Sequence, residues 1–111
     1  EIFSDQYWDT QWADALAMPV SLDQARAAGD LGDLPLAVLA ALTYPEGTGR
    51  DTERALQMEL AALSTNNRYE EVDGAGHITL VTEPPYAQVV SDRILRVVES
   101  ARTGEPLPAS P

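Results

Sequence analysis

Residues 34–42 of the chain read LPLAVLAAL, an apolar run without alternation between apolar and polar positions. A strand with this pattern is buried on both faces, as in a parallel sheet that is covered by helices. Alanine and leucine also favour a helix, but Pro35 near the start and the turn-forming residues TYPEG at 43–47 confine the run to strand length. The sequence therefore predicts a buried strand over Leu36–Leu42.

Helices and one further strand are expected on either side of this strand. In chain order, we expect helices over 5–17 and 21–29 separated by a break at Met18-Pro19, the strand, a helix from Asp51 or Thr52 to about Ser64, a strand over 68–72, and a helix starting at Pro84-Pro85. This alternation of strands and helices predicts an α/β fold with a right-handed crossover between two parallel strands.

Two strands are too few for a parallel sheet that is covered on both faces. The apolar run at 36–42 calls for a neighbouring strand on each side, and the chain offers only one. The sequence also opens at Glu1 without a methionine. We therefore expect the chain to be the end of a larger domain.

Composition excludes several classes of function. The 111 residues contain 7 Lys and Arg against 18 Asp and Glu, a net charge of −11, so no basic surface for nucleic acid is expected. There is no cysteine, which excludes disulfides, thiolate metal sites and a cysteine nucleophile. No apolar run approaches the roughly 18 residues of a membrane span.

The first expected helix carries both tryptophans of the chain. Trp8, Trp12 and Leu16 are spaced four apart and form one apolar stripe. Two interpretations are open: the stripe docks on a core, or the helix is a lid that lines a pocket.

His77 is the only histidine of the chain, and it follows the expected second strand through Gly74 and Gly76. Open α/β sheets place their chemistry on loops at the carboxyl ends of strands. Its imidazole is therefore a candidate proton shuttle, although a lone histidine is more often structural. No second histidine is present to build a metal site, and we expect no metal and no cofactor.

Several segments in order resemble the C-terminal part of the α/β-hydrolase superfamily, above all its bacterial serine hydrolases. They are LGDLPLAVL at 31–39, LQMELAALS at 56–64, GAGH at 74–77, Glu83-Pro84 and the helix over 89–98. The resemblance runs from about Trp8 to Arg102. It implies the end of a lid over residues 1–20, the C-terminal part of the hydrolase core over 21–102, and a flexible tail over 103–111.

The resemblance also implies a Ser-His-acid triad that hydrolyses a small ester or amide. His77 matches the histidine of the triad. None of the six serines lies in the Gly-x-Ser-x-Gly turn of the family, and its His-Gly oxyanion motif is missing too. The partner implied is therefore an N-terminal half of the same hydrolase that carries the serine and the oxyanion hole.

The acid of the triad is expected in the loop after the first strand. Glu46 is our first choice because it is nearest the strand end, and Asp51 is a second because it precedes His77 by 26 residues, although it is equally suited to cap the next helix. Glu53 is the third candidate, but we expect it to face solvent on the helix, and we expect Asp73 to stabilise a turn. The family usually has an aspartate where Thr43-Tyr44-Pro45 stand, so an acid from outside this chain is an alternative.

Two other functions stay open. The chain could belong to a non-catalytic relative that has lost its nucleophile and binds a ligand in the same pocket. It could also be an independent α/β binding module in which His77 is structural.

Overall fold

A computed structural model of the chain describes residues 5–109. The chain divides into two compact units, Glu1–Asp30 and Leu31–Pro111. Within residues 5–109, no helix combines the length and the apolar content that crossing a membrane requires.

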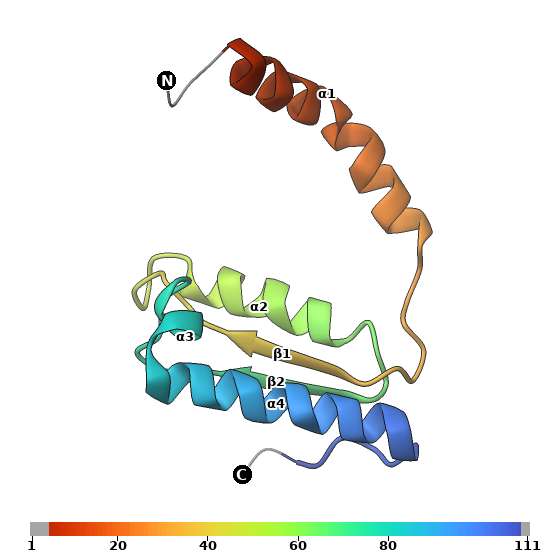
Figure 1. Cartoon of the computed structure of the whole chain (residues 1–111). Coiled ribbons are helices and arrows are strands. Elements are labelled where there is room, and N and C mark those ends of the chain that lie inside the picture. The colour runs from red at the N-terminus through yellow and green to blue at the C-terminus, as the bar shows by residue number, and fades with distance from the viewer. Residues whose placement is uncertain (1–4, 110–111) are drawn as a thin grey trace. The chain divides into compact units, whose positions relative to one another are not determined.

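The described residues of the first unit form the helix α1 (Asp5–Ala27), which includes Pro19. The predicted break at Met18-Pro19 is therefore wrong. A proline inside a helix removes one backbone hydrogen bond and tends to bend the helix rather than to end it when strong helix formers such as Ala15 and Ala17 surround it. Figure 1 shows that α1 bends along its length.

The apolar stripe on α1 lies on an exposed helix. None of its side chains is buried, and Trp8, Trp12 and Leu16 are 57%, 68% and 63% exposed. A helix of this kind leaves a large apolar surface in contact with water.

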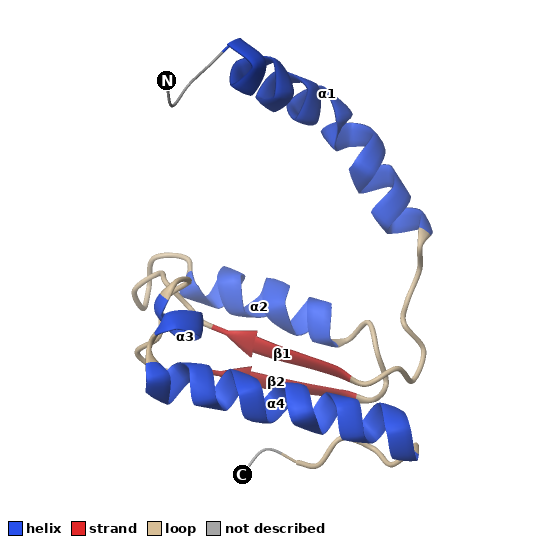
Figure 2. Cartoon of the chain, viewed as in Figure 1, coloured by secondary structure: helices blue, strands red, loops and turns tan. Residues whose placement is uncertain are grey.

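The second unit contains both strands and the remaining helices. In chain order these are β1 (Leu36–Ala40), α2 (Arg50–Ala61), β2 (Asn67–Glu71), α3 (Thr79–Thr82) and α4 (Pro84–Thr103). The strands pair in parallel, with Leu36 opposite Asn67 and Ala40 opposite Glu71 (Figure 2). The predicted α/β class and parallel pairing are confirmed.

The helices α2 and α4 cover opposite faces of the sheet. Arg54 of α2 binds Glu71, with Nε–Oε2 and Nη2–Oε1 distances of 2.6 and 3.1 Å. Arg93 of α4 binds the preceding residue, Glu70, through two contacts of 2.7 Å. Because neighbouring side chains of a strand point to opposite faces, these ion pairs hold one helix on each face (Figure 1).

The structure differs from the sequence predictions at several element boundaries and in one additional helix. The strand β1 ends at Ala40, two residues earlier than predicted. The N-cap of α2 is Gly49 in the left-handed conformation, not Asp51 or Thr52, which lie inside the first turn. The short helix α3 was not expected, whereas the predicted start of α4 at Pro84 is confirmed.

The tail after α4 packs against the rest of the second unit. Leu107 is only 3% exposed, and its backbone N–H donates to the Oδ1 atom of Asn66 at 2.9 Å. Arg68 donates to the carbonyl oxygens of Leu107 and Pro108. These contacts hold Leu107 and Pro108 at the start of β2. Residues 110 and 111 of the flexible tail expected over 103–111 lie outside the described residues.

Candidate functional site

His77 lies between the end of β2 and the start of α3, and local contacts fix the loop that carries it. Ala75 is buried, and its N–H donates to the carbonyl of Val72 at 3.3 Å. The N–H of Gly76 donates to the hydroxyl of Thr79 at 2.7 Å. The two residues that precede His77 are thus held in place.

Gly74 is required in this loop for two reasons. Its φ of +81° lies in the left-handed region, where side chains with a Cβ are strained. A Cβ at this position would also lie 2.7 Å from the hydroxyl oxygen of Tyr86, on α4. The close approach of Tyr86 ties the His77 loop to the last helix.

His77 itself is exposed. Within residues 5–109, no hydrogen bond or ion pair holds its imidazole. A histidine that stabilises a fold normally donates or accepts at least one hydrogen bond. The loop therefore presents an imidazole whose two nitrogens are both available to other groups.

The turn after β1 is organised by the carboxylate of Glu53, in the first turn of α2. Its Oε1 atom accepts the N–H of Thr43 at 3.0 Å and the Thr43 hydroxyl at 3.2 Å. Its Oε2 atom accepts the N–H groups of Thr43 and Tyr44 at 3.1 and 3.2 Å. The backbone N–H of Thr43 lowers the pKa of the Glu53 carboxyl against its partial desolvation, with Arg50 adding to the effect.

A small cavity of about 120 Å³ joins this turn to the His77 loop. It lies at the carboxyl ends of the parallel strands, where α/β sheets bind ligands. Its polar side chains are His77, Glu53 and Gln57, and the other lining residues are Leu39, Ala40, Ala41, Leu42 and Leu80. A base and a carboxylate thus share one partly apolar cavity.

Glu46 and Asp51, the acids expected from the sequence, do not line this cavity. The side chain of Glu46 is 74% exposed and lies 3.8 Å from Arg50. The side chain of Asp51 is 91% exposed and lies 3.2 Å from Arg54. Of the three carboxylates considered from the sequence, only Glu53, which was expected to face solvent, shares the cavity with His77.

No serine among residues 5–109 lines the His77 cavity. The hydroxyls of Ser64 and Ser100 are buried and committed to carbonyl oxygens, that of Ser64 to Leu34 and that of Ser100 to Glu105 at 2.6 Å. Over the same part of the chain, no three histidine or acidic side chains gather into a metal-binding group.

Comparison with models of known families, with curated proteins and with solved structures finds no match to this chain.

Proposed function

We propose that the chain is the C-terminal part of an α/β-hydrolase-type serine hydrolase and supplies the general base, His77, for cleavage of a small ester or amide. One observation carries the proposal. An exposed imidazole without an internal partner sits beside a carboxylate at the carboxyl ends of two parallel, helix-covered strands. This is the edge of an α/β sheet where catalytic side chains gather.

In this reaction the imidazole must transfer a proton through one nitrogen and be held in one tautomer through the other. Its Nε2 atom takes the proton of the serine hydroxyl as that oxygen attacks the carbonyl carbon, and then gives the proton to the leaving alkoxide or amine. The Nδ1–H must meanwhile be held by an acceptor that fixes the tautomer. The free nitrogens of His77 meet both requirements once a serine and a carboxylate approach them.

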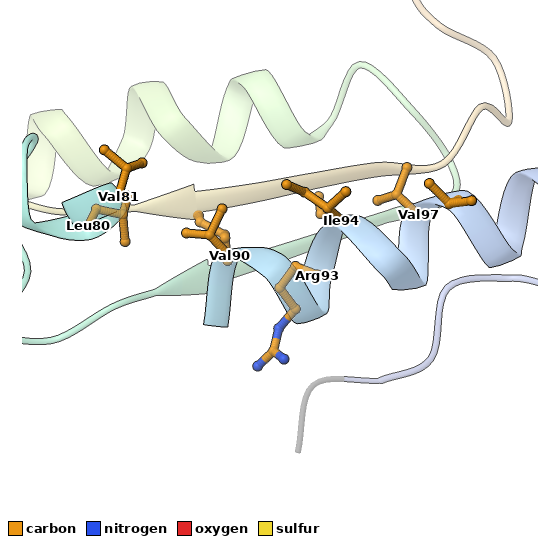
Figure 3. A pocket seen from close by; sticks show the side chains of 9 residues that line it. Leu80, Val81, Val90, Arg93, Ile94 and Val97 are labelled. Carbon is orange, nitrogen blue, oxygen red and sulfur yellow. The ribbon is translucent and has the colours of Figure 1, made fainter. Parts of the chain in front are cut away.

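The proposed partner is the part of the hydrolase that carries the serine, packed against the open edge of β1. Within residues 5–109, β1 pairs with β2 on one side and with no strand on the other. An open apolar groove of about 350 Å³ runs beside it. Figure 3 shows Val90, Ile94 and Val97 of α4 projecting into this groove, with the guanidinium of Arg93 pointing the other way.

The residues of the two edge strands differ, and the difference supports the β1 edge as the one that the partner covers. The strand β2 bears Glu70 and Glu71, whose ion pairs with Arg93 and Arg54 suit the solvent-facing border of a sheet. The strand β1 has only apolar residues, and two of them, Val38 and Ala40, are already buried. Apolar strands of parallel sheets belong between two neighbours.

Apolar side chains are also exposed on α2, which covers the other face of the sheet. Leu56, Met58 and Leu60 are all about half exposed on this single helix. Exposed apolar area of this extent marks a surface that another part of a protein covers. In the proposed enzyme, the serine-bearing part buries it.

A serine-directed fluorophosphonate probe tests the proposal on the full gene product together with any polypeptide that copurifies with it. We expect the label on a serine outside the 111 residues and hydrolysis of p-nitrophenyl esters or anilides. His77→Ala should lower kcat by about a thousandfold or more, because the serine then loses its base. Gln88→Ala, an exposed change on α4, is the control. Activity that survives His77→Ala, or a label on a serine of this chain, would overturn the proposal.

A further inference from the structure

The carboxylate of Glu53 lines the same cavity as His77. The strand β1 leads into the turn at Thr43 and Tyr44, and α2 returns over the sheet, so that its first turn lies at the carboxyl end of β1. Figure 1 shows this first turn and α3 at the same end of the sheet. Two segments 24 residues apart in sequence are thus brought to one cavity.

The carboxylate of Glu53 is held in a fixed orientation by Thr43 and Tyr44. Three donors reach its two oxygens: the N–H and hydroxyl of Thr43 and the N–H of Tyr44. The four contacts fix the orientation of the group, and the N–H of Thr43 is shared between its two oxygens.

The negative charge of Glu53 also suits it to accept the Nδ1–H of an imidazole. Backbone N–H groups lower the pKa of its carboxyl, so that it is ionised at neutral pH. An ionised carboxylate that accepts Nδ1–H stabilises the imidazolium that forms when the base takes a proton. It also leaves Nε2 free for the serine.

The other acidic side chains near the loop do not line the His77 cavity. Glu46 and Asp51 each pair with an arginine of α2 and point into solvent outside the cavity. Asp73 is exposed and does not line the cavity either.

We infer that Glu53 is the positioning carboxylate of His77, accepting its Nδ1–H across the cavity at the carboxyl ends of β1 and β2. The catalytic meaning of this contact rests on the proposed function. His77 is exposed and no hydrogen bond within residues 5–109 holds its imidazole, so its side chain can rotate about both χ angles. Catalytic hydrogen bonds are often long before the substrate and the full site are present.

The single histidine makes a direct test straightforward. Nitrogen-15 NMR of the full 111-residue chain at about pH 9, where an imidazole is neutral, reports which ring nitrogen carries the proton. We expect the wild type to hold a larger share of the Nδ1–H tautomer than Glu53→Gln. In that variant, the spectrum should move toward the Nε2–H form that free histidine favours.

Two control variants separate positioning from a general change in the turn. Glu59→Gln removes an exposed carboxylate of the same helix and should leave the tautomer ratio as in the wild type. Thr43→Val removes one hydrogen bond to Glu53 but keeps the charge, and it should have a much smaller effect than Glu53→Gln. An unchanged ratio in Glu53→Gln, or an equal change in Thr43→Val, overturns the inference. A change produced by Glu46→Gln or Asp51→Asn instead would assign the acid to that residue and overturn it as well.

Kinetics of the serine-bearing enzyme distinguish this inference from the proposed function. Glu53→Gln should lower kcat by about a hundredfold to ten-thousandfold with little change in KM. If His77→Ala abolishes activity but Glu53→Gln does not lower kcat, the hydrolase proposal stands and the inference fails. If the tautomer shifts but no serine hydrolase activity is found, Glu53 positions His77 and the proposed function fails.

Discussion

The guanidinium of Arg93 holds both carboxylate oxygens of Glu70 at 2.7 Å, so that α4 is tied to β2 by a two-pronged ion pair. The side chains are 14% and 24% exposed, which keeps water from screening the pair fully. Few large side chains are buried in the core of the second unit. We therefore expect ion pairs such as this one to contribute to the stability of helix packing on the sheet.

Replacing Arg93 with methionine should destabilise the chain. The change leaves the partly buried carboxylate of Glu70 without its donor, which typically lowers the free energy of unfolding by about 1–3 kcal/mol. Arg102→Met, an exposed change in the last turn of α4, is the matched control and should be close to neutral. Urea denaturation followed by circular dichroism measures both. Equal midpoints for the two variants would show that the ion pair adds nothing.

Stability should fall when the pH is lowered through the range of the glutamates. Hydrogen bonds from Arg93 and Arg54 lower the pKa values of Glu70 and Glu71, and the Thr43 N–H lowers that of Glu53. Their stabilisation is fully present above the unfolded-state pKa of about 4.3 and is lost as the pH falls through the lower folded-state values. Urea midpoints between pH 7 and pH 3 should follow this course.

The double variant Glu70→Gln with Glu71→Gln supplies the control for this pH dependence. Neutral amides keep part of the hydrogen bonding but do not titrate, so the variant should be less stable at pH 7 and lose less stability on acidification. A pH profile parallel to that of the wild type would place the titrating groups elsewhere.

Gly74→Ala should weaken the His77 loop more than an ordinary glycine replacement does. The left-handed backbone alone costs about 1–2 kcal/mol, and the new Cβ would also press on the hydroxyl of Tyr86 at 2.7 Å. Gly47→Ala is the matched control, because Gly47 has a φ of +78° with nothing within 4 Å. In a Tyr86→Phe background, the loss of stability for Gly74→Ala should approach that for Gly47→Ala. An equal loss for the two alanines in the wild-type background would contradict the steric part of the argument.

Leu107→Ala should destabilise the second unit although it lies beyond the last helix. Leu107 is 3% exposed, and removing such a buried side chain costs about 2–5 kcal/mol. Leu95→Ala removes the same atoms from a side chain of α4 that is 67% exposed, and it should have little effect. Thermal unfolding of the two variants compares them directly, and a neutral Leu107→Ala would mean that the tail is not part of the fold.

Much of the fold was predictable because its signals are local. The apolar run at 36–42 and its flanking prolines predicted β1, and the adjacent prolines at 84 and 85 predicted the start of α4. The parallel pairing followed from the strand–helix–strand order. The continuous α1 was not predicted, because one proline weakens a helix without deciding whether its neighbours continue it.

The sequence by itself determined that the chain is acidic, lacks cysteine and has one histidine, and that this histidine follows a strand at a glycine-rich turn. From the sequence, Glu46 ranked first, Asp51 second and Glu53 last as the acid, although the three lie within eight residues of one another. Only the tertiary structure brought Glu53 to the cavity of His77, because the direction of a side chain in the first turn of α2 depends on how that helix packs across the sheet. The burial of Leu107 was decided in the same way, by distant contacts with Asn66 and Arg68 that no local pattern encodes.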